Sequence, residues 1–356
     1  MRVLLLARYG RLGATSRQRH LLFLPALAAA GIQVTVDALL DDDYVRRLHE
    51  GRKPRPGAIL AAYARRLARM PAAGRWDAVW VEKEILPWLP AVAERWLALA
   101  GVPMVVDYDD AWFHRYDRHP RPLVRRLLGG KIARVMRTAA TVVAGNGYIA
   151  EHARRAGAGR IEIVPTVVDT GAYRPQPAPD GRPPTIGWIG TPGNARYLDP
   201  IRPALAAACR DAGARLLLVG AGGAEALGGL PGEVRAWDQA REAADLADMD
   251  IGVMPLPDSD FERGKCGYKL IQYMAAGRPA VASPVGVNGT IVAEGRAGFL
   301  PAGPEAWTEA LLALARDPAL RRRMGEAGRE RATVHYSLAA WAPHQVRILR
   351  EAMERR

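Results

Sequence analysis

The segment RGKCGYKLIQYMAAGRPAVAS, residues 263–283, carries side chains suited to binding a strongly charged anion. Lys265, Lys269 and Gln272 have the spacing of one helix face, and apolar side chains at three- and four-residue spacing form another face. Glycines lie at the predicted start of this helix, whose N-terminal amides add to the positive potential of the lysines. We therefore expect this face to bind a diphosphate. The alternative is a solvated helix on which the two lysines have no ligand.

A glycine loop follows a predicted strand in IGWIGTPGNARYL, residues 186–198. The backbone at Gly190 and the hydroxyl of Thr191 offer hydrogen-bond donors, and Arg196 lies near the start of the next helix. Glycine lets a ligand approach the backbone closely, and helix N-termini favour anions. This loop therefore predicts a second phosphate-binding element.

The loop after the first apolar stretch, RYGRLGATSRQRH, also combines glycines with basic side chains. Gly10 and Gly13 precede a predicted helix that carries Arg17. The two glycines are three residues apart, and the third glycine of the dinucleotide-binding fingerprint is absent. An anion-binding loop and a plain turn both remain open.

Acidic side chains crowd the end of a predicted strand in VVDYDDAWFHRYD, residues 105–117. Carboxylates are costly to bury without a partner, so Asp109 and Asp110, with His114 nearby, are our candidates for catalysis. The alternative is a structural role for these acids as helix caps or as partners of arginines. Asp107 and Asp109 superficially match an Asp-any-Asp metal motif, but we predict no metal site.

Short apolar runs alternate with helix-like stretches, the pattern of parallel sheets wound with helices. The predicted strands are at residues 2–8, 33–39, 78–82, 103–108, 141–145, 161–165, 185–190, 215–220, 250–256 and 279–283. The predicted helices are at residues 17–30, 58–70, 88–100, 122–139, 198–211, 240–247, 266–276 and about 304–356. The proline-rich residues 171–184 predict a linker between two doubly wound halves. Ligands of such folds bind outside the carboxyl ends of the strands.

The bulk composition is that of a globular protein of 356 residues, which is long enough for two domains. Two cysteines, Cys209 and Cys266, make neither a disulfide framework nor a metal-ligand spacing, so we expect a reducing, cytoplasmic environment. No apolar run approaches the roughly 20 residues of a membrane-spanning helix.

The net charge of +13 is concentrated in residues 1–170, which hold 27 Lys/Arg against 16 Asp/Glu. The sequence has no zinc-finger spacing, RNP-type aromatic cluster or recognition-helix signature, so we expect no nucleic-acid partner. The basic stretches at residues 46–70 and 118–137 fit two interpretations. One is a solvated arginine-rich surface, and the other is peripheral contact with the inner face of an anionic membrane.

With these residues in place, the chain resembles the retaining glycosyltransferases of family 4, which have the two-domain GT-B fold. The resemblance spans nearly the whole chain. In chain order, four stretches are similar to the family's interdomain stretch, the segment before its donor site, its Ala-Met-Ala-any-Gly-any-Pro-Val-Val motif and its terminal helix. They are VPTVVDTGAYRP (164–175), DLADMDIGVMPLPDSD (245–260), YMAAGRPAVAS (273–283) and HYSLAAW (335–341).

The chain departs from the family at the sugar-nucleotide motif. The family has two glutamates separated by seven residues, and Gly264 and Gln272 occupy their places here. The resemblance implies that Gln272 hydrogen-bonds a ribose hydroxyl, whereas Gly264 lacks the carboxylate expected near the donor sugar and its α-phosphate. The family's Arg and Lys for the diphosphate fall on Thr191 and Arg196, so Lys265 or Lys269 is our candidate for the missing cation. 

Trp237 and Asp238 match the place where the family holds the nucleobase. The family's catalytic histidine has no clean counterpart, and Asp109, Asp110 or His114 are the nearest residues.

The resemblance implies a glycosyltransferase that moves a sugar from a UDP- or GDP-type nucleoside-diphosphate sugar to a sugar, lipid-linked or small-molecule acceptor, with retention and without a cofactor. The pathway would be glycan, glycolipid or natural-product biosynthesis. The implied acceptor domain is residues 1–170 with a returning helix at about 338–356, and the donor domain is residues 185–337. Gly10, Gly13 and Arg17 would then lie on the acceptor side. A donor-binding scaffold without activity and a sugar-nucleotide 2-epimerase remain alternatives.

Overall fold

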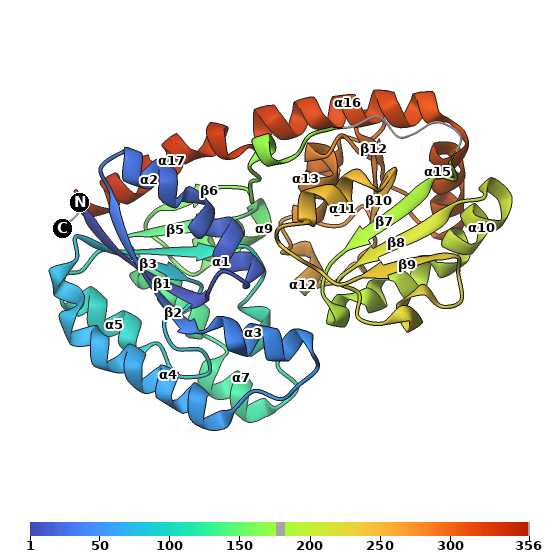
Figure 1. The fold of residues 1–356 in the computed structure, drawn as a ribbon. Helices are drawn as coiled ribbons and strands as arrows, with labels where there is room; N and C mark the ends of the chain where they lie inside the picture. Colours follow the sequence, from blue (N-terminus) through green and yellow to red (C-terminus); the bar gives the residue numbers. More distant parts are fainter. Residues whose placement is uncertain (176–181, 355–356) are drawn as a thin grey trace. The chain divides into compact units, whose positions relative to one another are not determined.

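The computed structural model describes residues 1–175 and 182–354 (Figure 1). The linker predicted at residues 171–184 therefore lies partly outside the described residues.

Two six-stranded parallel sheets form the framework, in the orders β2-β1-β3-β4-β5-β6 and β12-β11-β10-β7-β8-β9. The strands of the first sheet are β1 (Arg2–Tyr9), β2 (Gln33–Leu40), β3 (Ala78–Glu82), β4 (Met104–Tyr108), β5 (Thr141–Ala144) and β6 (Ile161–Ile163). The strands of the second sheet are β7 (Thr185–Ile189), β8 (Arg215–Val219), β9 (Gly232–Arg235), β10 (Ile251–Met254), β11 (Ala280–Ala282) and β12 (Gly298–Phe299). The predicted fold class, two doubly wound α/β halves, is confirmed.

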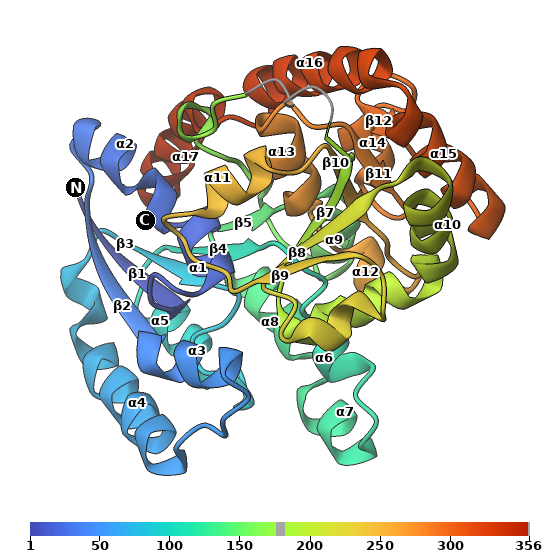
Figure 2. The ribbon, with the colours of Figure 1, turned by 45° about the vertical axis from the view of Figure 1, so that its right-hand side comes forward.

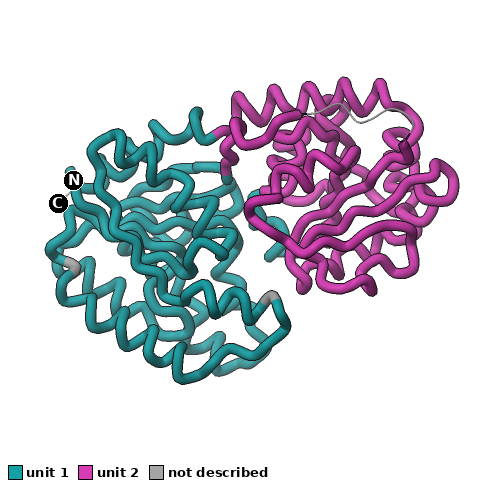
Figure 3. Tube along the Cα trace, in the orientation of Figure 1, with its two compact units in different colours: residues 1–166, 260–266, 338–356 teal, residues 167–259, 267–337 magenta. Residues whose placement is uncertain are grey.

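The chain divides into two compact units (Figure 3). Unit 1 comprises Met1–Thr166, Asp260–Cys266 and Leu338–Arg356, and unit 2 comprises Val167–Ser259 and Gly267–Ser337. The expected donor domain began at residue 185 and included residues 260–266, whereas the structure begins unit 2 at Val167 and groups Asp260–Cys266 with unit 1.

Helices cover both faces of each sheet (Figures 1 and 2). The α-helices of unit 1 are α1 (Ala14–Arg19), α2 (Leu24–Ala29), α3 (Asp42–His49), α4 (Pro56–Arg69), α5 (Val92–Leu99), α6 (His114–Asp117), α7 (Pro122–Leu128), α8 (Lys131–Thr138), α9 (Gly147–Arg155), α12 (Asp260–Arg263) and α17 (Leu338–Met353). Those of unit 2 are α10 (Arg202–Ala212), α11 (Glu242–Ala247), α13 (Tyr268–Ala275), α14 (Asn288–Val292), α15 (Pro304–Arg316) and α16 (Pro318–His335). Short 3-10 helices are at Leu21–Phe23, Met70–Arg75, Thr170–Ala172, Pro192–Ile201 and Ala224–Leu227.

The central strands are apolar because they are covered on both sides. Every residue of β3 (AVWVE), β4 (MVVDY) and β10 (IGVM) is buried. Strands buried on both faces read as continuous apolar runs, which explains why the sequence located them. The parallel register pairs Glu82, the last residue of β3, with Asp107 of β4, so the acidic loops after these strands are neighbours.

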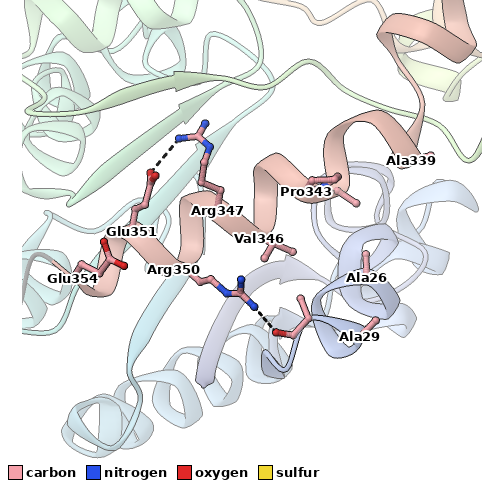
Figure 4. A pocket seen from close by; sticks show the side chains of 11 residues that line it. Ala26, Ala29, Ala339, Pro343, Val346, Arg347, Arg350, Glu351 and Glu354 are labelled. Carbon is pink, nitrogen blue, oxygen red and sulfur yellow. Dashed lines mark hydrogen bonds and ion pairs between the residues drawn. The ribbon is translucent and has the colours of Figure 1, made fainter.

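The helix α17 packs against α2 within unit 1 (Figure 4). A groove of about 740 Å³ lies between them, lined by alanines of both helices and by charged side chains of α17, among which Arg347 and Glu351 are paired. Arg350 donates a hydrogen bond to the carbonyl of Ala30 at 2.7 Å. Pro343 lies inside α17, and the helix continues to Met353.

Several elements differ from the sequence prediction. The edge strand β9 (GEVR) is only partly buried, and β12 spans two residues, so neither presents an apolar run. The helix predicted over residues 122–139 is two helices, α7 and α8, separated by Gly129 and Gly130. Helices α3, α6, α9, α12 and α14 were not predicted, and the helical stretch predicted at about 304–356 is three helices, α15, α16 and α17.

Candidate active site

The carboxyl ends of the strands carry most of the predicted site residues. The strand order reverses between β1 and β3 in unit 1 and between β7 and β10 in unit 2. Ligands of doubly wound sheets bind at such switch points. The predicted site residues lie in the segments after β1 and β4 of unit 1 and after β7, β9 and β10 in the chain. The loop after β3 is their neighbour at the same edge of the first sheet.

In unit 1, a lysine that the sequence analysis did not select holds the two candidate acids together. Lys83 follows β3, and its Nζ lies 2.8 Å from Oδ1 of Asp109 and 3.7 Å from Oδ2 of Asp110. Burial disfavours the charged ammonium, but the two carboxylates more than compensate, so the pKa of Lys83 lies above its ordinary value. Burial acts to raise the pKa of Asp109, but Lys83 lowers it below its ordinary value. Both groups are therefore charged at neutral pH.

Asp107 has the structural role that the sequence left open as the alternative. Its carboxylate accepts hydrogen bonds from Nε and Nη2 of Arg19 at 2.9 and 3.1 Å. Both side chains are buried, and Nη1 of Arg19 also donates to the carbonyl of Val164 at 2.7 Å. This bidentate pair joins α1 to β4 and to the segment after β6.

Glu84 is fully committed to protein partners. It accepts hydrogen bonds from the indole of Trp112 at 2.6 Å, the hydroxyl of Tyr116 at 2.9 Å and Nζ of Lys131 at 2.5 Å. The Glu84 and Lys131 side chains are 1% and 0% exposed. Glu84 therefore fixes the loop after β3 and is not available to a ligand.

His114, the third catalytic candidate, bonds to partners outside the acid cluster. Its Nδ1 lies 2.9 Å from Oδ1 of Asp117, and its Nε2 lies 2.9 Å from the hydroxyl of Tyr148. Both ring nitrogens are therefore engaged in unit 1, at the start of α6. The structure brings Asp109 and Asp110 together and places His114 in a separate hydrogen-bonded group.

The glycine loop after β1 packs against an acid. A Cβ atom at Gly10 would lie 2.5 Å from Oδ1 of Asp42, and the same oxygen accepts a hydrogen bond from the amide of Leu12 at 3.0 Å. The amide of Gly13 donates to the carbonyl of Gly10 at 3.2 Å, and Arg17 is buried and donates to the carbonyl of Arg11. The backbone amide of Leu12 thus already donates to the carboxylate of Asp42 and is not available to an anion.

Gly264 and Lys265, near the start of the segment at residues 263–283, are hydrogen-bonded within unit 1. Asn146, after β5, donates from Nδ2 to the carbonyls of Gly264 at 2.8 Å and Lys265 at 3.2 Å. The Nζ atom of Lys265 lies 3.8 Å from Oδ1 of Asp110. The structure therefore separates Lys265 from Lys269 and Gln272, which belong to unit 2. 

In unit 2, the loop after β7 and the helix α13 meet at one indole. A Cβ atom at Gly190 would lie 2.4 Å from Cη2 of Trp188, and Nζ of Lys269 lies 5.7 Å from a Trp188 ring centroid. Thr191 and Arg196 are exposed, in the loop and in the 3-10 helix that follow β7. The predicted phosphate loop and one of the two predicted lysines are thus neighbours.

The predicted base and ribose residues belong to one hydrogen-bonded chain. The indole of Trp237 donates to Oε2 of Glu242 at 2.9 Å, and the hydroxyl of Tyr173 donates to Oε1 of Glu242 at 3.2 Å. Nε2 of Gln272 donates to the Tyr173 hydroxyl at 3.4 Å. Asp238 is exposed and accepts from a backbone amide of its own loop. Gln272 itself is 2% exposed, so its amide is held by the fold.

Solved structures with this fold include three that match almost the whole chain. Sucrose-phosphate synthase from Thermosynechococcus elongatus is 17% identical, covers 99% of each chain and has a TM-score of 0.71. HepE from Anabaena in complex with UDP-glucose is 16% identical over 99% of this chain and 100% of that chain, with a TM-score of 0.71. WaaG, a glycosyltransferase involved in lipopolysaccharide biosynthesis, is 15% identical over 98% and 99%, with a TM-score of 0.68. At these identities the likeness concerns the fold.

The sequence itself matches two glycosyltransferase families in the expected order. Residues 13–166 match the family described as Glycosyl transferase 4-like domain, and residues 183–317 match the family described as Glycosyl transferases group 1. The chain belongs to the family 4-like GT-B glycosyltransferases. The activity of such an enzyme is sugar transfer. A search of curated proteins finds no significant match to this sequence.

The glycosyltransferase has site residues that sequence reasoning missed. Lys83 lies between Glu82 and Glu84 in the sequence. The register of β3 and β4, which pairs Glu82 with Asp107, brings Lys83 next to Asp109. Glu242 and Tyr173 lie 69 residues apart and meet only in the folded unit. One feature of the sequence could have identified Lys83. It directly follows the buried strand β3, which pairs with β4, the strand that precedes Asp109 and Asp110.

In the described part of this glycosyltransferase, no cluster of three or more His, Cys, Asp or Glu side chains is arranged to hold a metal ion. Among the same residues, no helix is both long enough and apolar enough to cross a bilayer.

Proposed function

We propose that this glycosyltransferase transfers a sugar from a nucleoside-diphosphate sugar with retention of configuration, and that unit 2 binds the donor. The observation that carries the proposal is that Gly190, Trp237 and the pair Lys269 and Gln272 lie in the segments that follow β7, β9 and β10, three strands of one parallel sheet. Two of the similar structures support it, because HepE was solved in complex with UDP and with UDP-glucose. Retention, a UDP- or GDP-type base and independence from metal follow from the family resemblance.

Each proposed donor residue has a definite task. Trp237 lies beside the base, and the family resemblance assigns the buried Gln272, whose Nε2 donates to the Tyr173 hydroxyl, to the ribose. The backbone at Gly190, together with Lys269 and Arg196, lies at the diphosphate. Fixed cations and amides act mainly on the charge that develops on the leaving diphosphate, which is where preorganised electrostatics accelerates such a transfer. Lys269 takes the place of the missing family cation, since it belongs to unit 2 with the other proposed donor residues, whereas Lys265 belongs to unit 1.

The Lys269→Ala variant is expected to bind its nucleoside diphosphate at least tenfold more weakly than the wild type. The measurement is a thermal-shift titration with UDP, GDP, ADP, CMP and dTDP, with and without magnesium. One nucleotide at a hundredfold excess over Kd should stabilise the wild type by about 2.7 kcal/mol, and a tenfold loss of affinity removes about 1.4 kcal/mol of this. Lys53→Ala, an exposed lysine of unit 1, is the matched control. Equal shifts for both variants would contradict the assignment of Lys269.

The same titration tests the other functions. If no nucleotide stabilises the wild type, the proposed donor site is wrong, and an inactive scaffold that has lost its donor site becomes the favoured interpretation. If a nucleotide binds and incubation with its sugar form yields an epimer, the protein is a 2-epimerase. Release of the sugar, or its transfer to an added acceptor, supports glycosyl transfer.

We further propose that the acceptor is lipid-linked and that α7 contacts an anionic membrane surface. Leu123 and Leu127 on this helix are 66% and 58% exposed, and Arg125 and Arg126 beside them are also exposed. Figure 2 shows α7 at the periphery of unit 1. No acid occurs between Arg118 and Arg137 in the sequence. Exposed leucines among arginines suit the boundary between headgroups and acyl chains, where each basic residue contributes about 1 kcal/mol.

The Leu123→Ser/Leu127→Ser variant is expected to bind vesicles containing anionic phosphatidylglycerol at least tenfold more weakly than the wild type. Burial of one leucine side chain is worth about 1.5–3 kcal/mol, so the loss of two exceeds this threshold. Co-sedimentation with the vesicles measures binding, and Val334→Ser, at an exposed position of unit 2, is the control. Wild-type protein that stays in the supernatant would refute the membrane contact.

A further inference from the structure

Position 264 of this chain has no room for a side chain. A Cβ atom built on Gly264 would lie 2.4 Å from Cβ, 2.6 Å from the backbone nitrogen and 2.9 Å from Cα of Ala111. Two of these three atoms belong to the backbone, so a change of rotamer cannot relieve the overlap. Asn146 holds the carbonyl of Gly264 at 2.8 Å, which fixes the segment against the loop after β4. The carboxylate that the family resemblance leads one to expect at position 264 is therefore excluded by packing.

A different carboxylate lies directly beside the excluded position. Asp110 precedes Ala111 in the chain, and its two oxygens lie near two ammonium groups. Oδ2 is 3.7 Å from Nζ of Lys83, and Oδ1 is 3.8 Å from Nζ of Lys265. The side chain of Asp110 is 26% exposed, so it is held in place from two sides and still reaches solvent.

The neighbouring acids do not have this combination. Asp109 is in closer contact with Lys83, at 2.8 Å, and its side chain is 14% exposed. Glu84 is 1% exposed and accepts hydrogen bonds from three protein groups. Among the acids of this cluster, Asp110 is therefore the one that can meet a substrate.

Lys83 is held in a conformation that most lysines avoid. Its φ angle is 64°, in the left-handed region. Its amide donates to the carbonyl of Asp107 at 3.0 Å, and its ammonium lies 4.7 Å from a ring centroid of Trp112. Strain of this kind persists where the surrounding structure over-determines it, and it gathers at active sites. The strained turn directs the ammonium at the two aspartates.

We propose that the carboxylate of Asp110 accepts a hydrogen bond from a sugar hydroxyl of the substrate, and that Lys83 is its positioning residue. The inference rests on the proposed function and deepens it, because it names the group that recognises a sugar at the carboxyl edge of unit 1. Because position 264 has no room for a side chain against Ala111, the negative charge of the site comes from the loop after β4. The contact is a binding contact in which no covalent bond forms or breaks. The hydroxyl belongs either to the donor sugar or to the acceptor.

Steady-state kinetics of Asp110→Asn decides between a substrate contact and a structural role. We expect KM for one sugar substrate to rise at least tenfold, while KM for the other substrate changes less than threefold. The substrate whose KM rises identifies the source of the hydroxyl. Asp43→Asn, at an exposed position on α3, is the matched control and is expected to behave as the wild type. If both KM values of Asp110→Asn stay within twofold of those of Asp43→Asn, the proposal is wrong.

A double-mutant cycle tests the positioning role of Lys83. Lys83→Met is expected to raise the same KM, and Lys83→Arg, which keeps the charge, is expected to restore at least part of the loss. Because Lys83 acts through Asp110, the Lys83→Met/Asp110→Asn double variant should bind that substrate no more weakly than Asp110→Asn alone. Fully additive losses would overturn the positioning role. A wild-type enzyme without any sugar-nucleotide turnover would refute the proposed function, and this inference with it.

The packing argument is tested without activity. Gly264→Ala is expected to lower the melting temperature by several degrees, because the added Cβ overlaps the backbone of Ala111. Gly193→Ala, where a Cβ meets nothing within 4 Å, is the control in the 3-10 helix Pro192–Ile201 of unit 2. Equal melting temperatures for Gly264→Ala and the wild type would remove the structural basis of the inference.

Discussion

Replacement of Arg19 by methionine is expected to lower the free energy of unfolding by about 3–5 kcal/mol. The guanidinium makes a bidentate pair with Asp107, at 2.9 and 3.1 Å, and donates to the carbonyl of Val164 at 2.7 Å. The two side chains are 3% and 2% exposed. Methionine fills much of the same space, but it leaves the Asp107 carboxylate buried without its partner. The cost is therefore mainly the desolvation of an unpaired charge.

Urea unfolding of the variant measures this loss directly. Arg154→Met is the control, because Arg154 pairs with Glu151 at an exposed position where an ion pair contributes little to stability. The double variant Arg19→Met/Asp107→Leu should recover part of the stability, since it removes both charges. If Arg19→Met and Arg154→Met lose the same free energy, the buried pair is not the anchor that its geometry indicates.

Acidification is expected to destabilise the protein through His20. Its ring lies 4.7 Å from that of Trp80, it is fully buried, and neither ring nitrogen hydrogen-bonds to a described residue. Burial lowers the pKa of His20 to about 4 from the ordinary value of 6.5. Between these two pH values the unfolded chain binds more protons than the folded chain, so stability falls as the pH falls through this window. The loss is about 2 kcal/mol between pH 7 and pH 5, and about 3 kcal/mol in total.

The His20→Leu variant isolates this contribution, because it removes the titrating ring and keeps an apolar side chain against Trp80. Urea unfolding at pH 7 and pH 5 should show a smaller loss for His20→Leu than for the wild type, by about 2 kcal/mol. His335→Gln, at an exposed position on α16, should keep the wild-type dependence on pH. An unchanged pH dependence in His20→Leu would show that other groups cause the acid sensitivity.

The sequence analysis located the strands that are apolar on both faces and the loops that follow them. Buried parallel strands such as β3, β4 and β10 are recognisable as continuous apolar runs without polar alternation. The alternation of these apolar runs with helical stretches along the chain predicted a doubly wound fold. Elements of low burial, such as β9, gave no such signal. The break between α7 and α8 at Gly129 and Gly130 was also missed, because helical periodicity continues on both sides of the two glycines.

Within the candidate site, the sequence by itself determined which loops and which residue types face the carboxyl edges. It did not determine the partners of those residues. Lys265 and Lys269 share one predicted helix face, yet the structure assigns Lys265 to unit 1, beside Asp110, and Lys269 to unit 2, beside Trp188. The strained turn at Lys83 and the lack of space at Gly264 also arise only from tertiary packing. Spacing along the chain encodes periodicity and strand order, whereas charge pairing and steric exclusion depend on residues brought together from distant segments.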